Sequence, residues 1–195
     1  TSATTDQFKR MGRVINGHTT SSIGTDTIDS ATMSYTAYEK ASGLGNFLAN
    51  LSAVTPTNEN AVVSGDYAIA KYGSTKFATG IATDDWVIDQ STYNDLTINA
   101  TGEAYINTSG NTFFALRYEE DIDNSEPTWS SNTNSNITVL LADTSGTTAD
   151  PKLVVEHSAG SAAPGTLQDL RYEYDNVGNI TKITDNGGYN SAKVT

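Results

Sequence analysis

The stretch SATMSYTAY, residues 30–38, carries the clearest strand pattern of the chain. Every second side chain in it is apolar, and the residues between them are Thr or Ser. Side chains of a strand point alternately to its two faces, so a period of two predicts a strand with one buried face. The face that we expect in the core consists of Ala31, Met33, Tyr35 and Ala37.

Similar short runs recur through residues 8–158, and clusters of Gly, Asn, Asp, Ser and Pro separate them. These clusters favour turns between strands. Helical spacing is confined to residues 57–73 and 101–110. The pattern predicts an all-β fold, an antiparallel β-sandwich of the jelly-roll type. The further strands that we expect lie at residues 45–54, 95–100, 111–119, 135–143 and 151–158.

Composition limits the possible partners of the chain. It has 195 residues and a formal net charge of -12, which repels phosphate backbones and anionic lipids, so we expect no nucleic-acid partner. No apolar run approaches the roughly 18 residues that span a bilayer, so we expect no membrane insertion. The absence of Cys leaves the compartment open. Few Lys and many Thr and Asn residues are common on extracellular β proteins, and we expect an extracellular or cell-surface location.

A change of composition near residue 158 indicates the end of the first domain. The segment HSAGSAAPGT, residues 157–166, consists mostly of small residues and contains Pro164, which is typical of a linker. We therefore expect a sandwich domain at 1–158, a linker at 159–166 and a C-terminal appendage at 167–195.

The appendage contains RYEYDNVGNITKITDN, residues 171–186, with two alternating runs around a Gly-Asn pair. Gly takes positive φ without strain and Asn tolerates the left-handed region, so the segment predicts a β-hairpin. It resembles the YD repeat of RHS proteins, which implies one unit of a long β-spiral or shell on a large secreted or surface-displayed bacterial protein. One repeat cannot bury its apolar face alone, and we expect the chain to be part of a longer array. The residues that carry the resemblance are Tyr174, Asp175, Gly178, Asn179, Ile180 and Asp185.

The larger part of the chain, about residues 8–158, also resembles a family. TSSIGTDTIDSATMSYTAY, then YNDLTINATGEAYINTSGNTFFALRYEED, and finally DPKLVVEHS look like the DNRLRE or disaggregatase-related β-sandwich, which is grouped with carbohydrate-binding modules. The resemblance implies a non-catalytic binding or adhesion module of an RHS-repeat protein, with an acidic polysaccharide or another glycan, neutral ones included, as its ligand. The alternative is a structural subunit in which the unpaired hairpin edges add to other copies of the chain and build a fibre or surface assembly.

The sequence contains no recognisable catalytic motif. His18 lies in a turn-like region and His157 in the last predicted strand, and no Ser or Asp motif positions either imidazole as a base. Both are expected to be ordinary surface histidines. Carboxylate pairs are plentiful, but glycoside hydrolysis needs two of them at set distances across a cleft. We therefore expect no enzymatic activity.

Glycan binding requires exposed aromatic rings beside hydrogen-bonding side chains, because sugar C–H faces stack while hydroxyl groups need donors and acceptors. Candidate rings in such surroundings occur in DDW and PTWSSN and in three Tyr contexts. Each of them could equally belong to the core. The candidates are Trp86, Trp129, Tyr67, Tyr72 and Tyr93.

A calcium site is the ion site that the sequence favours. The segment EEDIDNSEP, residues 119–127, concentrates carboxylates in what we expect to be a loop. Ca²⁺ takes six to eight oxygen ligands, which such a loop can supply. A solvated acidic loop is the alternative interpretation. The predicted ligands are Asp121, Asp123, Asn124 and Glu126.

Overall fold

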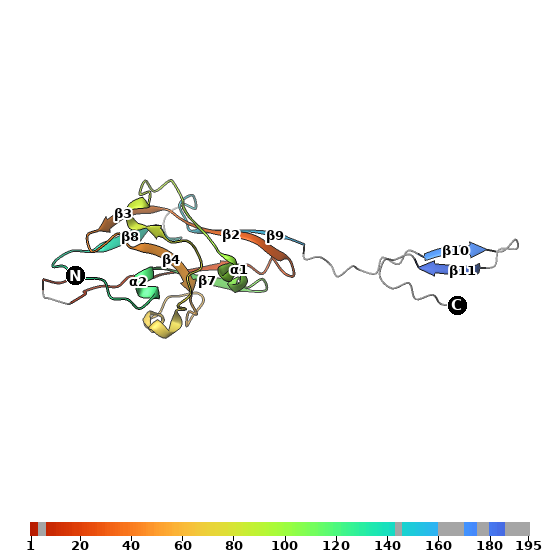
Figure 1. Ribbon diagram of the computed structural model, residues 1–195, viewed down its shortest axis with the longest axis horizontal. Helices are drawn as coiled ribbons and strands as arrows, with labels where there is room; N and C mark the ends of the chain where they lie inside the picture. The colour runs from red at the N-terminus through yellow and green to blue at the C-terminus, as the bar shows by residue number, and fades with distance from the viewer. Residues whose placement is uncertain (4–6, 143–145, 160–169, 175–179, 186–195) are drawn as a thin grey trace. The chain divides into compact units, whose positions relative to one another are not determined.

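The computed structural model describes residues 1–3, 7–142, 146–159, 170–174 and 180–185 (Figure 1). The chain divides into two compact units, Thr1–Ser158 and Ala159–Thr195. The division falls at the residue where the sequence pattern ends the first domain. Most of the predicted linker lies outside the described residues.

The first unit contains a four-stranded antiparallel sheet in the order β1-β7-β4-β5. These strands are β1 (Val14–Thr19), β7 (Asn111–Tyr118), β4 (Leu48–Ala53) and β5 (Ile81–Ala82). The two central strands, β7 and β4, carry most of the apolar side chains of this layer. The sequence pattern predicted both of these central strands, whereas β5 was missed.

The second layer of the sandwich consists of a three-stranded sheet and a two-stranded sheet. β2 (Thr27–Tyr35) lies between β6 (Asn94–Thr97) and β9 (Lys152–Ser158), and all pairings are antiparallel. The chain then continues almost directly into β3 (Ala37–Ser42), which pairs with β8 (Ser135–Val139). The two layers, together with a hairpin in the second unit, confirm the predicted fold class.

The core lies between the two layers. Ala31, Met33 and Tyr35 project inward from β2 and are fully or almost fully buried, as their alternation predicted. Leu51 of β4 and Phe114 of β7 pack in the same cluster from the opposite layer. The alternation in SATMSYTAY therefore predicts correctly which side chains face the core.

The outer face of this strand departs from the pattern at Thr36, which is completely buried although the alternation places it toward solvent. Its hydroxyl donates to the carbonyl of Ala149, 2.7 Å away, and its carbonyl accepts from the N–H of Leu140 at 3.0 Å. Thr36 thus holds both ends of the connection between β8 and β9. A contact with a distant loop buries it, and local alternation cannot reveal such a contact.

Short helical turns connect the strands. α1 (Ala100–Tyr105) begins after Asn99, whose side chain accepts from the N–H groups of Thr101 and Gly102, so the predicted helix at 101–110 is confirmed in its first half. The predicted helical segment at 57–73 contains the 3₁₀ turns η1 (Ser64–Tyr67) and η2 (Ile69–Lys71). Figure 1 shows them as yellow coils outside β4.

Two further turns were not predicted. η3 (Thr83–Asp85) follows β5, and α2 (Glu119–Ile122) follows β7. The acidic segment that we expected to be a loop therefore begins as one helical turn.

The sandwich is closed along one side and open along the other. On the closed side, a β-bridge joins Ala78 to Ile98, and the Asn50 side chain both donates to and accepts from the backbone of Ala78. On the other side the outer strands are β1 and β9. Within the described residues, β1 pairs only with β7 and β9 only with β2. Two free strand edges therefore border the open side.

The second unit contains an antiparallel hairpin of β10 (Leu170–Tyr174) and β11 (Ile180–Asp185). Tyr172 lies opposite Ile183, and both side chains are exposed. The strands confirm the predicted hairpin and include three residues of the repeat motif, Tyr174, Ile180 and Asp185. The other three, Asp175, Gly178 and Asn179, lie outside the described residues.

Candidate functional site

One of the five predicted glycan-binding rings belongs to the core. Trp86 is 1% exposed, and its ring centroid lies 6.4 Å from that of Tyr35. The indole N–H donates to the carbonyl of Ile81 at 3.3 Å. η3 turns the chain so that this ring points inward. Trp86 therefore has no free face for a sugar, and its predicted binding role is wrong.

The ring of Tyr93 is used to fix the connection between β8 and β9. Its hydroxyl donates to the carbonyls of Thr148 and Asp150, each 3.0 Å away. The ammonium group of Lys152 lies 4.0 Å from the ring centroid, within cation–π range. Trp129 is partly exposed, and its indole nitrogen is buried without a hydrogen-bond partner among the described residues.

Tyr67 and Tyr72 are brought together by Arg13. The Arg13 guanidinium carbon lies 5.1 Å from the Tyr67 centroid and 4.9 Å from the Tyr72 centroid. Arg117 approaches the Tyr72 ring to 5.0 Å, so this partly buried ring is occupied by protein cations. Tyr67 is 57% exposed, and its hydroxyl donates to the carbonyl of Met11. Tyr67 remains an exposed aromatic surface.

The first predicted calcium ligand, Asp121, binds two arginines instead. Arg13 donates from Nε and from a terminal nitrogen to the two carboxylate oxygens, both at 2.7 Å. Arg117 donates from Nε to one of those oxygens at 2.6 Å and from a terminal nitrogen to the Asp121 carbonyl. The side chain of Arg117 is 1% exposed, and its third donor contacts the carbonyl of Gly73. Through Arg13, which directly precedes β1, and Arg117 of β7, the cluster joins the first sheet to α2 and to the segment from Tyr67 to Gly73.

This arrangement determines the charge of Asp121. Burial raises the pKa of the carboxyl, but the hydrogen bonds from Arg13 and Arg117 outweigh burial and hold its pKa below the ordinary value. The hydrogen bond to Asp121 in turn raises the pKa of Arg13. Asp121 is therefore a structural anion whose oxygens already have cationic partners.

The other acidic side chains of the segment do not converge on one point. Lys76 binds Glu119 at 2.8 Å and Asp123 at 2.7 Å, and both hydrogen bonds raise the pKa of the Lys76 ammonium. Asn124 has a positive φ of 52°, and Glu126 is exposed. In the described part of the chain, no three acidic or histidine side chains are grouped as a metal ion requires. The predicted calcium loop is thus corrected to a helical turn in which Glu119, Asp121 and Asp123 pair with cations of the chain.

A cleft of about 280 Å³ lies beside the end of β4 and the start of β7. β7 supplies its aromatic wall through Phe113, which points away from the core because the neighbouring Phe114 points into it. The chain after β4 and the end of α1 supply the remaining walls. The polar and aromatic residues that line the cleft are Thr55, Glu59, Tyr105, Asn107, Asn111, Thr112 and Phe113.

Local contacts hold these groups in place. Phe113 lies opposite Gly17 on β1, and a Cβ at Gly17 would come within 2.5 Å of Phe113 Cε1, so glycine is what lets the ring lie close against the strand. Asn111 Nδ2 donates to Glu59 Oε2 at 2.8 Å, and Asn111 Oδ1 accepts from the hydroxyl of Thr19 at 3.2 Å. An aromatic ring, a carboxamide and a carboxylate therefore share one recess.

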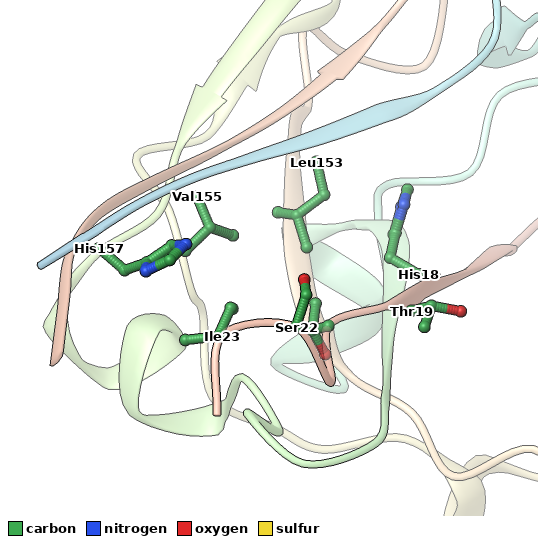
Figure 2. Close-up of a pocket in the computed structure, with 8 residues that line it drawn as sticks. His18, Thr19, Ser22, Ile23, Leu153, Val155 and His157 are labelled. Carbon is green, nitrogen blue, oxygen red and sulfur yellow. The ribbon is translucent and has the colours of Figure 1, made fainter. Parts of the chain in front are cut away.

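A second pocket, of about 260 Å³, lies at the open side of the sandwich and brings both histidines of the chain to one place (Figure 2). His157 Nδ1 lies 2.7 Å from Asp26 Oδ2. Burial lowers the pKa of His18, and its Nε2 has no hydrogen-bond partner among the described residues. Ser22 also lines the pocket, but in the described chain no hydrogen bond joins it to either imidazole.

Comparisons with known proteins add no relative: no protein family, curated protein or solved structure matches the chain. None of the helices in the described ranges is both long and apolar enough to span a membrane.

The residues of the cleft around Phe113 were not predicted from the sequence, although one signal was present. In NTFFALRYE two aromatic residues are adjacent, and adjacent strand residues point to opposite faces. One of Phe113 and Phe114 therefore had to lie outside the core. No comparable signal marks Glu59 and Asn107, because the fold brings them to the cleft from distant loops.

Proposed function

We propose that the sandwich is a non-catalytic binding module for a neutral glycan, which it holds in the cleft around Phe113. The observation that carries the proposal is the hydrogen-bonded Asn111–Glu59 pair beside that ring. A sugar presents C–H faces that pack on an aromatic ring and hydroxyl groups that pair with amide and carboxylate oxygens. The cleft offers both kinds of surface within one recess.

Charge favours a neutral ligand over an acidic polysaccharide. Among the described residues that line the cleft none is Lys or Arg, and Glu59 contributes a carboxylate. The whole chain has a formal net charge of -12. An anionic sugar would meet repulsion with no cation to offset it.

The same lining favours binding over hydrolysis. Glycosidases place two carboxyl groups about 5–10 Å apart on either side of the scissile bond. Glu59 is the only acidic residue among the described residues of the cleft. We infer that the module holds a glycan without cleaving it.

We further propose that the module belongs to a secreted or cell-surface protein of the RHS-repeat type and serves in adhesion. The support is the resemblance of residues 171–186 to the YD repeat and the composition of the chain, which is rich in Thr and Asn and poor in Lys. The hairpin of β10 and β11 is compatible with one such repeat.

A glycan array probed with the full chain tests the proposal. We expect binding to neutral oligosaccharides and loss of that binding in Phe113→Ala and Glu59→Gln, the second being a small change on an exposed residue. Tyr67→Ala removes an exposed ring that does not line the cleft and serves as the matched control. Absence of binding to every neutral glycan, or loss of binding in the control but not in the cleft variants, would refute the proposal.

A further inference from the structure

Strand β9 is a free edge of the second sheet. It is seven residues long and, in the described chain, pairs with β2 alone. Val154, the third of its seven residues, is 47% exposed on the outer face. Free edges of this length offer unpaired N–H and C=O groups to another strand, and natural sheets usually cover or interrupt them.

The backbone groups that point outward from β9 follow from the pairing of β2. The carbonyl of Ala31 accepts from the N–H of Ile98, so the backbone groups of Ala31 face the β6 side. Those of the next residue, Thr32, face β9 and therefore its partner Val154. The N–H and C=O groups of Leu153 and Val155 consequently point to the free edge.

The side chains of β9 are complementary to a second copy of the same strand. We propose that β9 pairs antiparallel with β9 of another molecule around a two-fold axis at Val154. Each Lys152 then lies opposite Glu156 of the other copy, and the two Val154 side chains meet between these ion pairs. A two-fold axis makes every contact occur twice. Lys152 and Glu156, four residues apart in each strand, would therefore form two identical ion pairs across the interface.

The alternative register is less favourable. An axis at Val155 would place exposed Val154 opposite Glu156 and leave Lys152 opposite Ser158. The axis at Val154 instead puts Leu153 and Val155 opposite each other through their outward backbone groups. Charge and hydrophobic matching both select this register.

The pairing also covers the pocket at the open side. Figure 2 shows Leu153, Val155 and His157 projecting from β9 toward Ser22 and Ile23 on the loop after β1. Leu153 and Val155 are only partly buried in the single chain. A second strand at this edge would extend the second layer of the sandwich over the pocket. It would complete the burial of Leu153 and Val155. This proposal does not depend on glycan binding.

Sedimentation velocity on the full chain, up to about 1 mM, tests the proposal. We expect a concentration-dependent dimer that Val154→Lys abolishes, because the two-fold axis would bring two ammonium groups together. Lys152→Glu and Glu156→Lys should each weaken the dimer at least tenfold, and combining them should restore it. Ile69→Lys, on a residue 54% exposed elsewhere on the surface, is the control. A chain that stays monomeric, or a dimer that survives all β9 variants, overturns the proposal.

A cross-link tests the register itself. The chain has no Cys, so Val154→Cys introduces a single thiol on the proposed axis. Residues facing each other without backbone hydrogen bonds have Cα atoms about 4.5 Å apart, within the range of a disulfide. Under mild oxidation we expect this variant to form a covalent dimer much faster than Ile69→Cys or Glu156→Cys. Equal rates for the three variants would contradict the register.

Discussion

The hydroxyl of Tyr35 lies 2.8 Å from Nδ2 of Asn16, and this hydrogen bond crosses the core from β2 in one layer to β1 in the other. Both residues are buried. Burial raises the pKa of Tyr35 far above its ordinary value, so the hydroxyl keeps its proton. This hydrogen bond therefore links the two layers at the open side of the sandwich.

The first prediction concerns this bond. Tyr35→Phe leaves the Asn16 carboxamide without its partner and should lower the free energy of unfolding by about 1–3 kcal/mol. Tyr35→Ala should cost about 3–5 kcal/mol, since it also leaves a cavity. Urea denaturation measures both. Tyr38→Phe, on an exposed ring, should have almost no effect, and an equal loss in that control would contradict the role of the bond.

The second prediction concerns Asp121 and pH. Asp121→Asn leaves Arg13 and the buried Arg117 without their anion and should lower the free energy of unfolding by about 3 kcal/mol at pH 7. The folded pKa of Asp121 is lowered, so its contribution is present above the unfolded value of about 3.9 and is lost as pH falls through the folded pKa. Denaturation curves from pH 7 to about pH 2 should therefore show the two proteins converging in acid. A difference that is independent of pH would argue against the ionic account.

The third prediction concerns calcium. A site with a Kd near 1 mM would add about 1 kcal/mol at about 5 mM Ca²⁺ and raise the Tm by about 2–4 °C. Because Glu119, Asp121 and Asp123 already have cationic partners in the chain, we expect calcium to shift the Tm by less than about 1 °C in a thermal melt. Lys76→Ala frees Glu119 and Asp123 and is the sensitive comparison. A clear stabilisation of the unmodified chain by calcium would contradict this prediction and support the metal site predicted from the sequence.

The fourth prediction concerns a glycine inside α1. Gly102→Ala should destabilise although Ala favours helices, because the new Cβ would lie 2.5 Å from Ile98 Cγ2 and 3.0 Å from the Phe77 carbonyl oxygen. We expect a loss of about 1–3 kcal/mol. Gly12→Ala is the control, since nothing lies within 4 Å of its Cβ position. A gain of stability in Gly102→Ala would show that α1 packs less closely.

The strands were predictable because alternation is a local property. SATMSYTAY identifies its buried face without knowledge of the partner strands. Thr36 shows the limit of this rule, since its burial depends on a loop more than a hundred residues away.

The functional site was less predictable than the strands, because the sequence does not show whether an aromatic residue lies in the core or in a binding site. Trp86 was selected for its polar neighbours, but the turn after β5 buries it. Asp121 was selected as a ligand, but Arg13, which directly precedes β1 and lies 108 residues away in the sequence, binds it. Only the fold reveals such a distant partner.

Amide chemical-shift mapping tests the central claim most directly. The ¹⁵N-labelled full chain is titrated with sets of neutral gluco-, manno- and galacto-oligosaccharides. We predict that at least one set perturbs amides around Glu59, Asn107, Asn111 and Phe113, and that Phe113→Ala removes the response while Tyr67→Ala keeps it. Absence of any perturbation, or perturbations concentrated around Tyr67, would contradict the glycan-binding cleft.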